Sequence, residues 1–530
     1  MGVSAQNRKL LCKVQPRKAL NPSIATVRPR AKPRMESVIL ATSIDMQKRV
    51  SMRLRSLAAL ALITSVFAHA QSTPVERAFL AAKKNPPALR AFLVQMPKGG
   101  DLHIHLTGAI YAESFIDAAA HGMVCVDRTH MTFAPAKGST RSIPPLPVCG
   151  EGLVPASTAL HDQKLYDALL DSFSMRTFVP TSGTSGHDQF FATFDKFSAG
   201  GRGHSGRWVD EVATRAASQN EQYVEIMNTP DLSRILGIAS KVNYTGDVAA
   251  AKASIDPQVL KDAVEAARSE FAAIDADRLQ REHCGTPEAT PACKVQVRYL
   301  FQVLRALPIP AVFAQTLVAF ELASTDSRVV GLNYVQPEDT FASMSQYSEE
   351  MKMVGQFHTL YPKAHISLHA GELTLGMVPP EGLRFHIREA VEVAHAERIG
   401  HGVDVMYEDD AKGLLAEMAA KHVMVEINLT SNDGILGVVG KNHPLASYRE
   451  AHVPVALSTD DEGVSRSDIT NEYLRGALEQ DLSYKDLRTM ARTSLEHSFL
   501  SEGDKAAALA EFDRRVKAFE STFNTGAKRK

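Results

Sequence analysis

Short apolar runs that alternate with helical patterns constrain the fold of this chain more than any other feature. Eight runs rich in Val, Ile and Leu, each bounded by turn residues, are typical of buried strands. They cover residues 100–106, 222–228, 310–319, 329–336, 365–372, 398–405, 423–430 and 453–461. Amphipathic stretches between the later runs cover residues 380–396, 409–421 and 443–451. This alternation predicts a parallel sheet with helices outside it, and eight repeats are the number that closes a (β/α)8 barrel of the TIM type.

Two intervals between the runs are too long for simple crossovers. Residues 107–221 and 231–307 are therefore expected to hold helices and loops inserted after the first and second strands. The pattern beyond Thr470 is helical to the end of the chain. Residues 71–530 are predicted to form one barrel domain that carries these insertions.

The first 70 residues differ in composition from the rest. They hold 13 of the 59 Lys and Arg residues but 2 of the 60 Asp and Glu residues. Residues 52–70 begin with the basic Met52-Arg-Leu-Arg55, continue through an apolar stretch and end in Ala68-His69-Ala70, which are the three parts of a secretory signal peptide. We expect cleavage after Ala70, export to the periplasm or the medium, and a basic segment 1–51 outside the mature protein.

The predicted mature chain is acidic. Residues 71–530 hold 46 basic and 58 acidic residues, a net charge of −12, which argues against nucleic acid or an anionic membrane as partner. No apolar stretch reaches the ~20 residues that a membrane-spanning helix needs. The expected partner is a small molecule, and the sequence leaves the oligomeric state open, a homodimer included.

Four cysteines follow the predicted cleavage site, an even number. Pairing of nearest neighbours gives Cys125–Cys149 and Cys284–Cys293, each closing a loop rich in turn residues. The two other pairings, and buried free thiols, stay open at this point. No C-x-x-C motif is present, which argues against a zinc ribbon or a thioredoxin-type site. Disulfides would agree with an oxidising compartment.

Histidines mark the first and fifth runs. His103 and His105 are two residues apart in a predicted strand, so both side chains face the same side, which in a barrel is the lumen. Paired imidazoles there can chelate a borderline metal such as Zn²⁺. His369 ends the fifth run as a candidate third ligand, and Gly371 allows a sharp turn that brings Glu372 over the mouth of the barrel.

The sixth and eighth runs also end in polar residues. His401 stands between two glycines, and Asp460 and Asp461 follow an apolar strand. Successive strand residues face opposite ways, so Asp460 is expected to reach the metal and Asp461 the substrate. Packed histidines and helix-capping carboxylates are the alternatives for each residue alone. Their coincidence at successive strand ends predicts one active site, because barrel active sites lie on that face.

Five motifs, in this order, resemble those of adenosine deaminases. They are Met-Pro-Lys-Gly-Gly-Asp-Leu-His-Ile-His-Leu-Thr-Gly-Ala109, His-Ala-Gly-Glu372, Ile-Gly-His-Gly402, Leu-Thr-Ser-Asn432 and Ser-Thr-Asp-Asp461. The resemblance covers about residues 96–471, and the opening motif, signal peptide and early insertions are more similar to the secreted growth-factor branch. It implies an amidohydrolase-type (β/α)8 barrel that deaminates adenosine or deoxyadenosine to inosine or deoxyinosine and ammonia. One zinc ion per chain is implied, because residues 329–336 hold no Lys to bridge a second; its implied ligands are His103, His105, His369 and Asp460.

The resemblance also implies roles for the remaining site residues. His401 takes or orients the proton of the attacking water, Asp461 holds that water in line, and a protonated Glu372 donates to the purine ring. The implied substrate-binding residues are Thr107, Gln336 and Gly371.

Departures from the family pattern keep other substrates open. Thr107 stands where the family usually has an Asp that contacts the sugar, Gln336 replaces a Gly, and Glu462 replaces a Pro. The alternatives are a deaminase of another 6-aminopurine, another hydrolase of the superfamily, or a non-catalytic growth-factor-like binding protein.

Overall fold

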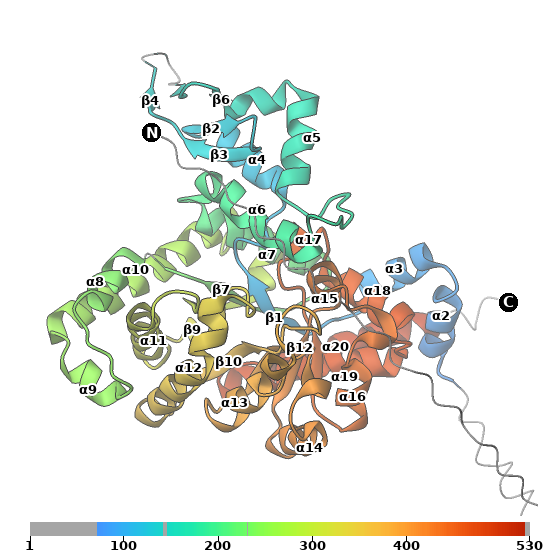
Figure 1. Ribbon diagram of the computed structural model, residues 1–530. Helices are drawn as coiled ribbons and strands as arrows, with labels where there is room; N and C mark the ends of the chain where they lie inside the picture. The colour runs from blue at the N-terminus through green and yellow to red at the C-terminus, as the bar shows by residue number, and fades with distance from the viewer. Residues whose placement is uncertain (1–71, 141, 143–145, 231, 525–530) are drawn as a thin grey trace, which may run out of the picture. The chain divides into compact units, whose positions relative to one another are not determined.

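An eight-stranded parallel sheet is the main sheet of the described residues, and helices surround it (Figure 1). The computed structural model describes residues 72–524 except 141, 143–145 and 231, so the expected signal peptide and upstream segment lie outside the described residues. The sheet order is β1-β7-β8-β9-β10-β11-β12-β13. The strands are β1 Gly100–His105, β7 Tyr223–Asn228, β8 Gln296–Leu304, β9 Val329–Val335, β10 His365–Ala370, β11 Arg398–His401, β12 Met424–Ile427 and β13 Val455–Leu457.

The last strand returns to the first and closes the barrel. Ile104 of β1 forms a parallel bridge with Asp460, just beyond β13. The Asp460 N–H donates to the His103 carbonyl at 2.8 Å, and the His105 N–H donates to the Asp460 carbonyl at 3.4 Å. The predicted (β/α)8 barrel is confirmed, and its closure places the ends of β1 and β13 side by side.

Helices surround the barrel as the amphipathic patterns predict. The later crossovers contain α13 His386–Glu392, α14 Ala411–Lys421 and α16 Leu445–Glu450, and the chain ends in α18 Ile469–Glu479, α19 Tyr484–Glu496 and α20 Glu502–Asn524. Before the barrel lie α2 Pro74–Ala82 and α3 Pro86–Gln95, and α12 Phe341–Leu360 connects β9 with β10. Among the described residues, no helix has both the length and the apolar composition to cross a bilayer.

The prediction of the third strand is wrong. Residues 310–319 lie in α11 Ile309–Ala323, and β8 takes the third place in the barrel. α11 is buried on nearly every side, with Val312, Phe313 and Leu317 fully buried, so its sequence lacks the polar face that reveals a helix. The interval 231–307 is therefore not all insertion, because its last part forms β8; the inserted helices are α8 Leu232–Ala239, α9 Val248–Ala253 and α10 Pro257–Arg281.

The interval after β1 contains a small β-structure and four α-helices. A three-stranded antiparallel sheet has the order β3-β2-β6, and β4 pairs with β5. These strands are β2 Val124–Asp127, β3 Thr132–Pro135, β4 Gly138–Ser139, β5 Pro147–Val148 and β6 Leu153–Pro155, and the helices are α4 Ala112–Ala120, α5 Gln163–Ser172, α6 Gly186–Gly201 and α7 Ser205–Ser218. Cys125–Cys149 links β2 to the residue after β5, and Cys284–Cys293 closes the loop after α10. Both nearest-neighbour pairings are confirmed.

A buried carboxyl on α12 makes folding stability depend on pH. Glu350 is fully buried, and neither carboxyl oxygen has a hydrogen-bond partner in the described part of the chain. Burial raises its pKa from 4.5 to about 8, although Arg305 opposes the shift. Between these pH values the folded state keeps a proton that the unfolded state releases, so stability falls as pH rises. We expect the free energy of unfolding of Glu350→Gln to rise relative to that of wild type by about 3.5 kcal/mol between pH 5 and pH 8. Denaturant unfolding at both pH values measures this, and a pH-independent difference would contradict it.

Candidate metal and active site

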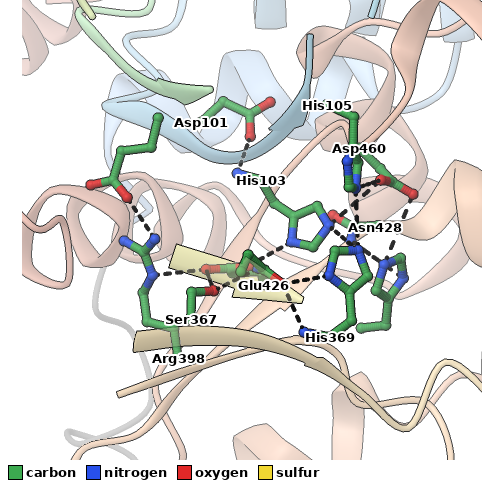
Figure 2. Close-up of polar contacts among 12 residues, drawn as sticks. Asp101, His103, His105, Ser367, His369, Arg398, Glu426, Asn428 and Asp460 are labelled. Carbon is green, nitrogen blue, oxygen red and sulfur yellow. Dashed lines mark hydrogen bonds and ion pairs between the residues drawn. The ribbon is translucent and has the colours of Figure 1, made fainter. Parts of the chain in front are cut away.

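Three imidazoles and one carboxylate point toward one another at the carboxyl ends of the strands (Figure 2). His369 Nε2 lies 3.1 Å from His103 Nε2 and 3.2 Å from His105 Nε2. Asp460 Oδ1 lies 3.5 Å from His103 Nε2 and 3.3 Å from His105 Nε2. Nitrogen ligands around a tetrahedral zinc ion, each about 2.0–2.1 Å from it, are themselves about 3.3 Å apart. The spacing of these four groups fits a single bound ion.

The opposite ring nitrogens determine where the lone pairs point. Each Nδ1 lies within hydrogen-bond distance of a side-chain oxygen that can accept its proton, which leaves the Nε2 lone pair of a neutral ring facing the common centre. The pairs are His103–Glu426 at 2.5 Å, His105–Gln302 at 2.8 Å and His369–Asn333 at 2.7 Å. These partners orient the three rings as a metal site requires.

Asp460 supplies negative charge beside the imidazoles of His103 and His105. Its Oδ1 is buried and accepts no hydrogen bond in the described residues, an arrangement that is costly unless a cation faces the oxygen. Although burial opposes it, contact with His103 and His105 holds the pKa of Asp460 well below its usual value. In the absence of a cation, burial disfavours a charged His103, but Asp460 and Glu426 outweigh it and raise the pKa of His103 to about 10. The donor set therefore fits a divalent cation that replaces this proton.

Glu426 forms a buried ion pair with Arg398, which in turn forms one with Glu225. Arg398 Nε lies 2.8 Å from Glu426 Oε1, and Arg398 Nη2 lies 2.5 Å from Glu225 Oε2. Ser367 Oγ donates to Glu426 Oε1 at 3.0 Å. Despite burial, Arg398 and His103 hold the pKa of Glu426 below its usual value, so the carboxylate that orients His103 stays charged.

Gly371 and Glu338 direct Glu372 into the cavity. Gly371 turns the chain after β10 at φ +74°, a conformation that favours glycine. Glu338 accepts from the Gly371 N–H at 3.1 Å and from the Glu372 N–H at 2.7 Å, so the turn is held without the Glu372 side chain. Burial, reinforced by the charges of Asp460 and Glu338, raises the pKa of Glu372 well above its usual value. Burial therefore favours the protonated form of Glu372, the form that can act as an acid.

His401 is neutral, and its tautomer is set by its neighbours. The Leu445 N–H donates to His443 Nδ1 at 3.1 Å, so His443 carries its proton on Nε2 and donates to Asn432 Oδ1 at 3.0 Å. The Asn432 amide then donates to His401 Nδ1 at 2.9 Å, which leaves the His401 proton on Nε2, 3.9 Å from Asp460 Oδ2. Burial lowers the pKa of His401 to about 3. This tautomer can orient an oxygen by donating to it.

Asp461 faces the cavity and does not cap a helix through its side chain. It is the N-cap residue of α17 Glu462–Ser465, but its carboxylate makes no capping hydrogen bond. Burial, with the charge of Asp460, raises the pKa of Asp461 well above its usual value. The structure therefore does not support the alternative that the Asp461 side chain caps a helix.

A cavity of about 350 Å³ opens onto these groups. A cluster of phenylalanines, Thr107 and Gln336 line it. Five of the predicted metal-binding and catalytic residues line it as well: His105, His369, Glu372, Asp460 and Asp461. The Gln336 backbone has a φ of 89°. Its side-chain oxygen accepts a hydrogen bond from the Ala306 N–H at 2.9 Å, so the side chain is bonded to the neighbouring loop. Gly371 does not line the cavity, and its N–H is used by Glu338.

The residues that hold the ligands and Glu372 were not predicted from the sequence. Glu426 and Asn333 carried a usable signal, because each is a polar residue inside an apolar strand at a buried position. Gln302 lies in β8, the strand that was not recognised, so no pattern pointed to it.

Gly400 provides a test of the site's packing. A Cβ on Gly400 would lie 2.6 Å from His103 Cε1, and the fully buried His103 ring cannot move without losing Glu426. We expect Gly400→Ala to weaken metal binding by about tenfold or more, as disturbed ligand orientation commonly does. Titration against a competing chelator measures this. The matched control is Gly237→Ala on α8, where a Cβ meets open space; equal affinities for the two variants would refute the packing argument.

A His and Asp cluster beside acid–base groups at the strand ends of a (β/α)8 barrel is the arrangement of a barrel enzyme that can use a bound metal ion. The chain belongs to the adenosine deaminase family, whose family model matches residues 203–515.

Individual relatives match over shorter stretches. An adenosine deaminase of Salmonella heidelberg is 39% identical over 144 residues, which are 27% of this chain and 40% of the relative. One of Clostridium perfringens is 29% identical over 187 residues, or 35% of this chain and 48% of the relative. The chain thus spans less than half the length of these curated relatives.

Solved structures share the fold. An N6-mAMP deaminase of Arabidopsis has a TM-score of 0.52 at 20% identity, covering 80% of this chain and 99% of its own. An amidohydrolase of Burkholderia ambifaria, solved with bound Zn, has a TM-score of 0.51 at 15% identity, covering 82% of this chain and 95% of its own.

Proposed function

We propose that the protein is a zinc-dependent hydrolase that converts adenosine or deoxyadenosine to inosine or deoxyinosine and ammonia. The observation that carries the proposal is the convergence of three Nε2 atoms and Asp460 Oδ1 beside Glu372, which lines the same cavity. Imidazole nitrogens with one carboxylate are the ligands zinc prefers. Membership of the adenosine deaminase family supports the reaction type.

The chain's residues divide the chemistry between them. A zinc ion bound by His103, His105, His369 and Asp460 would act as a Lewis acid and make water a nucleophile near neutral pH. His401 orients the attacking oxygen through its Nε2–H, and Asp461 accepts a hydrogen bond from the same water and holds it in line. Glu372 donates its proton to the ring nitrogen beside the carbon under attack, which neutralises charge as that carbon becomes tetrahedral. The C–N bond to the exocyclic amine then breaks. The amine takes the proton that the water gave up to Asp461 and leaves as ammonia, and the remaining hydroxyl proton returns to Glu372 as the 6-oxo group forms.

An activity assay tests the proposal directly. Protein that begins at Gln71 is loaded with zinc, and the ultraviolet shift from adenosine to inosine is followed with and without a chelator. We expect deamination that the chelator abolishes and added zinc restores. Zinc-loaded protein that is inactive on every 6-aminopurine tested would contradict the proposal, and activity confined to another aminopurine would replace adenosine with that substrate.

We also propose that the protein is exported. The two disulfides support this, because such bonds persist in oxidising compartments. Expression of the full chain in a bacterial host should yield periplasmic or secreted protein whose N-terminus is Gln71. Cytoplasmic protein that keeps residues 52–70 would contradict export.

A further inference from the structure

Helix α6 forms one wall of the cavity and brings a carboxylate to it. Phe190, Phe191 and Phe194 of α6 line the cavity, and so does Asp195. The start of the helix is fixed at two points. A Cβ on Gly186 would lie 1.9 Å from the Gly434 carbonyl oxygen, so the two backbones are in direct contact; His187 Nε2 lies 3.1 Å from Asp339 Oδ1, in the segment after β9. These two contacts fix the position of the start of α6.

The polar residues of the cavity fall into a buried group and an exposed group. The reacting end is buried, with His369, Glu372 and Asp460 less than one tenth exposed. Thr107 and Asp195 also line the cavity but are exposed, which places them at its outer end. Most of the other side chains that line the cavity are apolar; they are Phe190, Phe191, Phe194, Leu304, Val335, Pro337 and Ile435. A ligand whose purine reaches Glu372 thus projects its other half toward Thr107 and Asp195.

The outer end has acceptors but no cation. Within the described part of the chain, the Asp195 carboxylate makes no hydrogen bond or ion pair, so its oxygen atoms are available to a ligand in the cavity that Asp195 lines. No Lys or Arg is among the described residues that line the cavity. A carboxylate in such a position accepts hydrogen bonds from hydroxyl groups and repels a phosphate.

We propose that Asp195 is a specificity-determining residue that, with Thr107, binds a hydroxyl of the sugar and disfavours a phosphorylated sugar. The inference rests on the proposed function for the position of the purine. In this proposal Asp195 of α6 makes the stronger hydrogen bond to the sugar, because it is charged and Thr107 is not.

Substitution of Asp195 tests the subsite. Asp195→Asn keeps the shape but removes the charge, and Asp262→Asn, an exposed carboxylate on α10 outside the cavity, is the matched control. We expect Asp195→Asn to lower kcat/KM for adenosine about tenfold, the usual loss for a hydrogen bond to a charged group. Adenosine analogues lacking the 2′-, 3′- or 5′-hydroxyl identify the bound group, because its removal should affect wild type and leave Asp195→Asn unchanged. Asp195→Lys should raise the ratio of AMP to adenosine turnover about tenfold or more.

The outcomes separate this inference from the proposed function. An active wild type whose preferences for hydroxyl and phosphate groups are unchanged in the Asp195 variants overturns the subsite alone. A zinc-loaded wild type that is inactive on nucleosides overturns the proposed function. In that case the subsite is tested by calorimetry, which compares the affinity for inosine of wild type and Asp195→Asn. About tenfold weaker binding in Asp195→Asn supports it; equal affinity, or no inosine binding by wild type, overturns it.

Discussion

Glu372→Gln is expected to lower kcat for adenosine by about a thousandfold or more while leaving zinc content and melting temperature at wild-type values. A positioned general acid contributes about 10²–10⁴ in rate, and glutamine has no proton to transfer. The substitution is nearly isosteric. Glu338 holds the backbone of this turn through the Gly371 and Glu372 N–H groups, so the fold does not depend on the carboxyl.

The measurement pairs single-substrate kinetics with metal analysis on the same preparation. The matched control is Glu381→Gln, an exposed residue in the segment that follows β10, which should retain wild-type activity. Wild-type turnover by Glu372→Gln would show that Glu372 is not the proton donor. A loss of zinc together with activity would make it part of the metal site instead of a proton donor.

Asp460→Asn is expected to lose the zinc itself, and with it at least about a thousandfold in kcat/KM. The substitution removes the negative charge at the centre of the cluster, where Asp460 Oδ1 accepts no hydrogen bond from the described residues. A metal bound only by the folded state adds to its stability, so the effect has a second readout. A chelator should lower the melting temperature of wild type and leave that of Asp460→Asn unchanged.

Asp461→Asn provides the comparison, because it alters the neighbouring carboxylate without removing a ligand. It should keep its zinc and its chelator-sensitive melting temperature while losing turnover. If Asp460→Asn retained stoichiometric zinc and Asp461→Asn did not, the roles assigned to the two aspartates would be exchanged.

The barrel could be predicted from sequence because most of its strands are short apolar runs with turn residues on both sides. The failure at residues 310–319 has a physical cause. α11 packs on all sides, so its residues are as apolar as those of a buried strand, and the Pro before it fits either element. β8 carries Gln296, Arg298 and Gln302 at partly exposed positions, which conceal it among the inserted helices.

The ligands were easier to predict than the groups that orient them. His103, His105, His369 and Asp460 stand at strand ends, where chain order alone places them on one face of the barrel. Gln302 and Glu426 meet His105 and His103 only through the lateral packing of strands, which a single sequence does not encode in any local spacing. For the same reason no sequence pattern indicates Asp195, which reaches the cavity on a helix of the insertion.

Anomalous diffraction at the zinc edge, from crystals of the zinc-loaded protein, tests the central claim most directly. One strong peak is expected about 2.0–2.2 Å from Nε2 of His103, His105 and His369 and from Asp460 Oδ1. A fully zinc-loaded protein whose peak lies elsewhere, with the four side chains around nothing but solvent, would contradict the account.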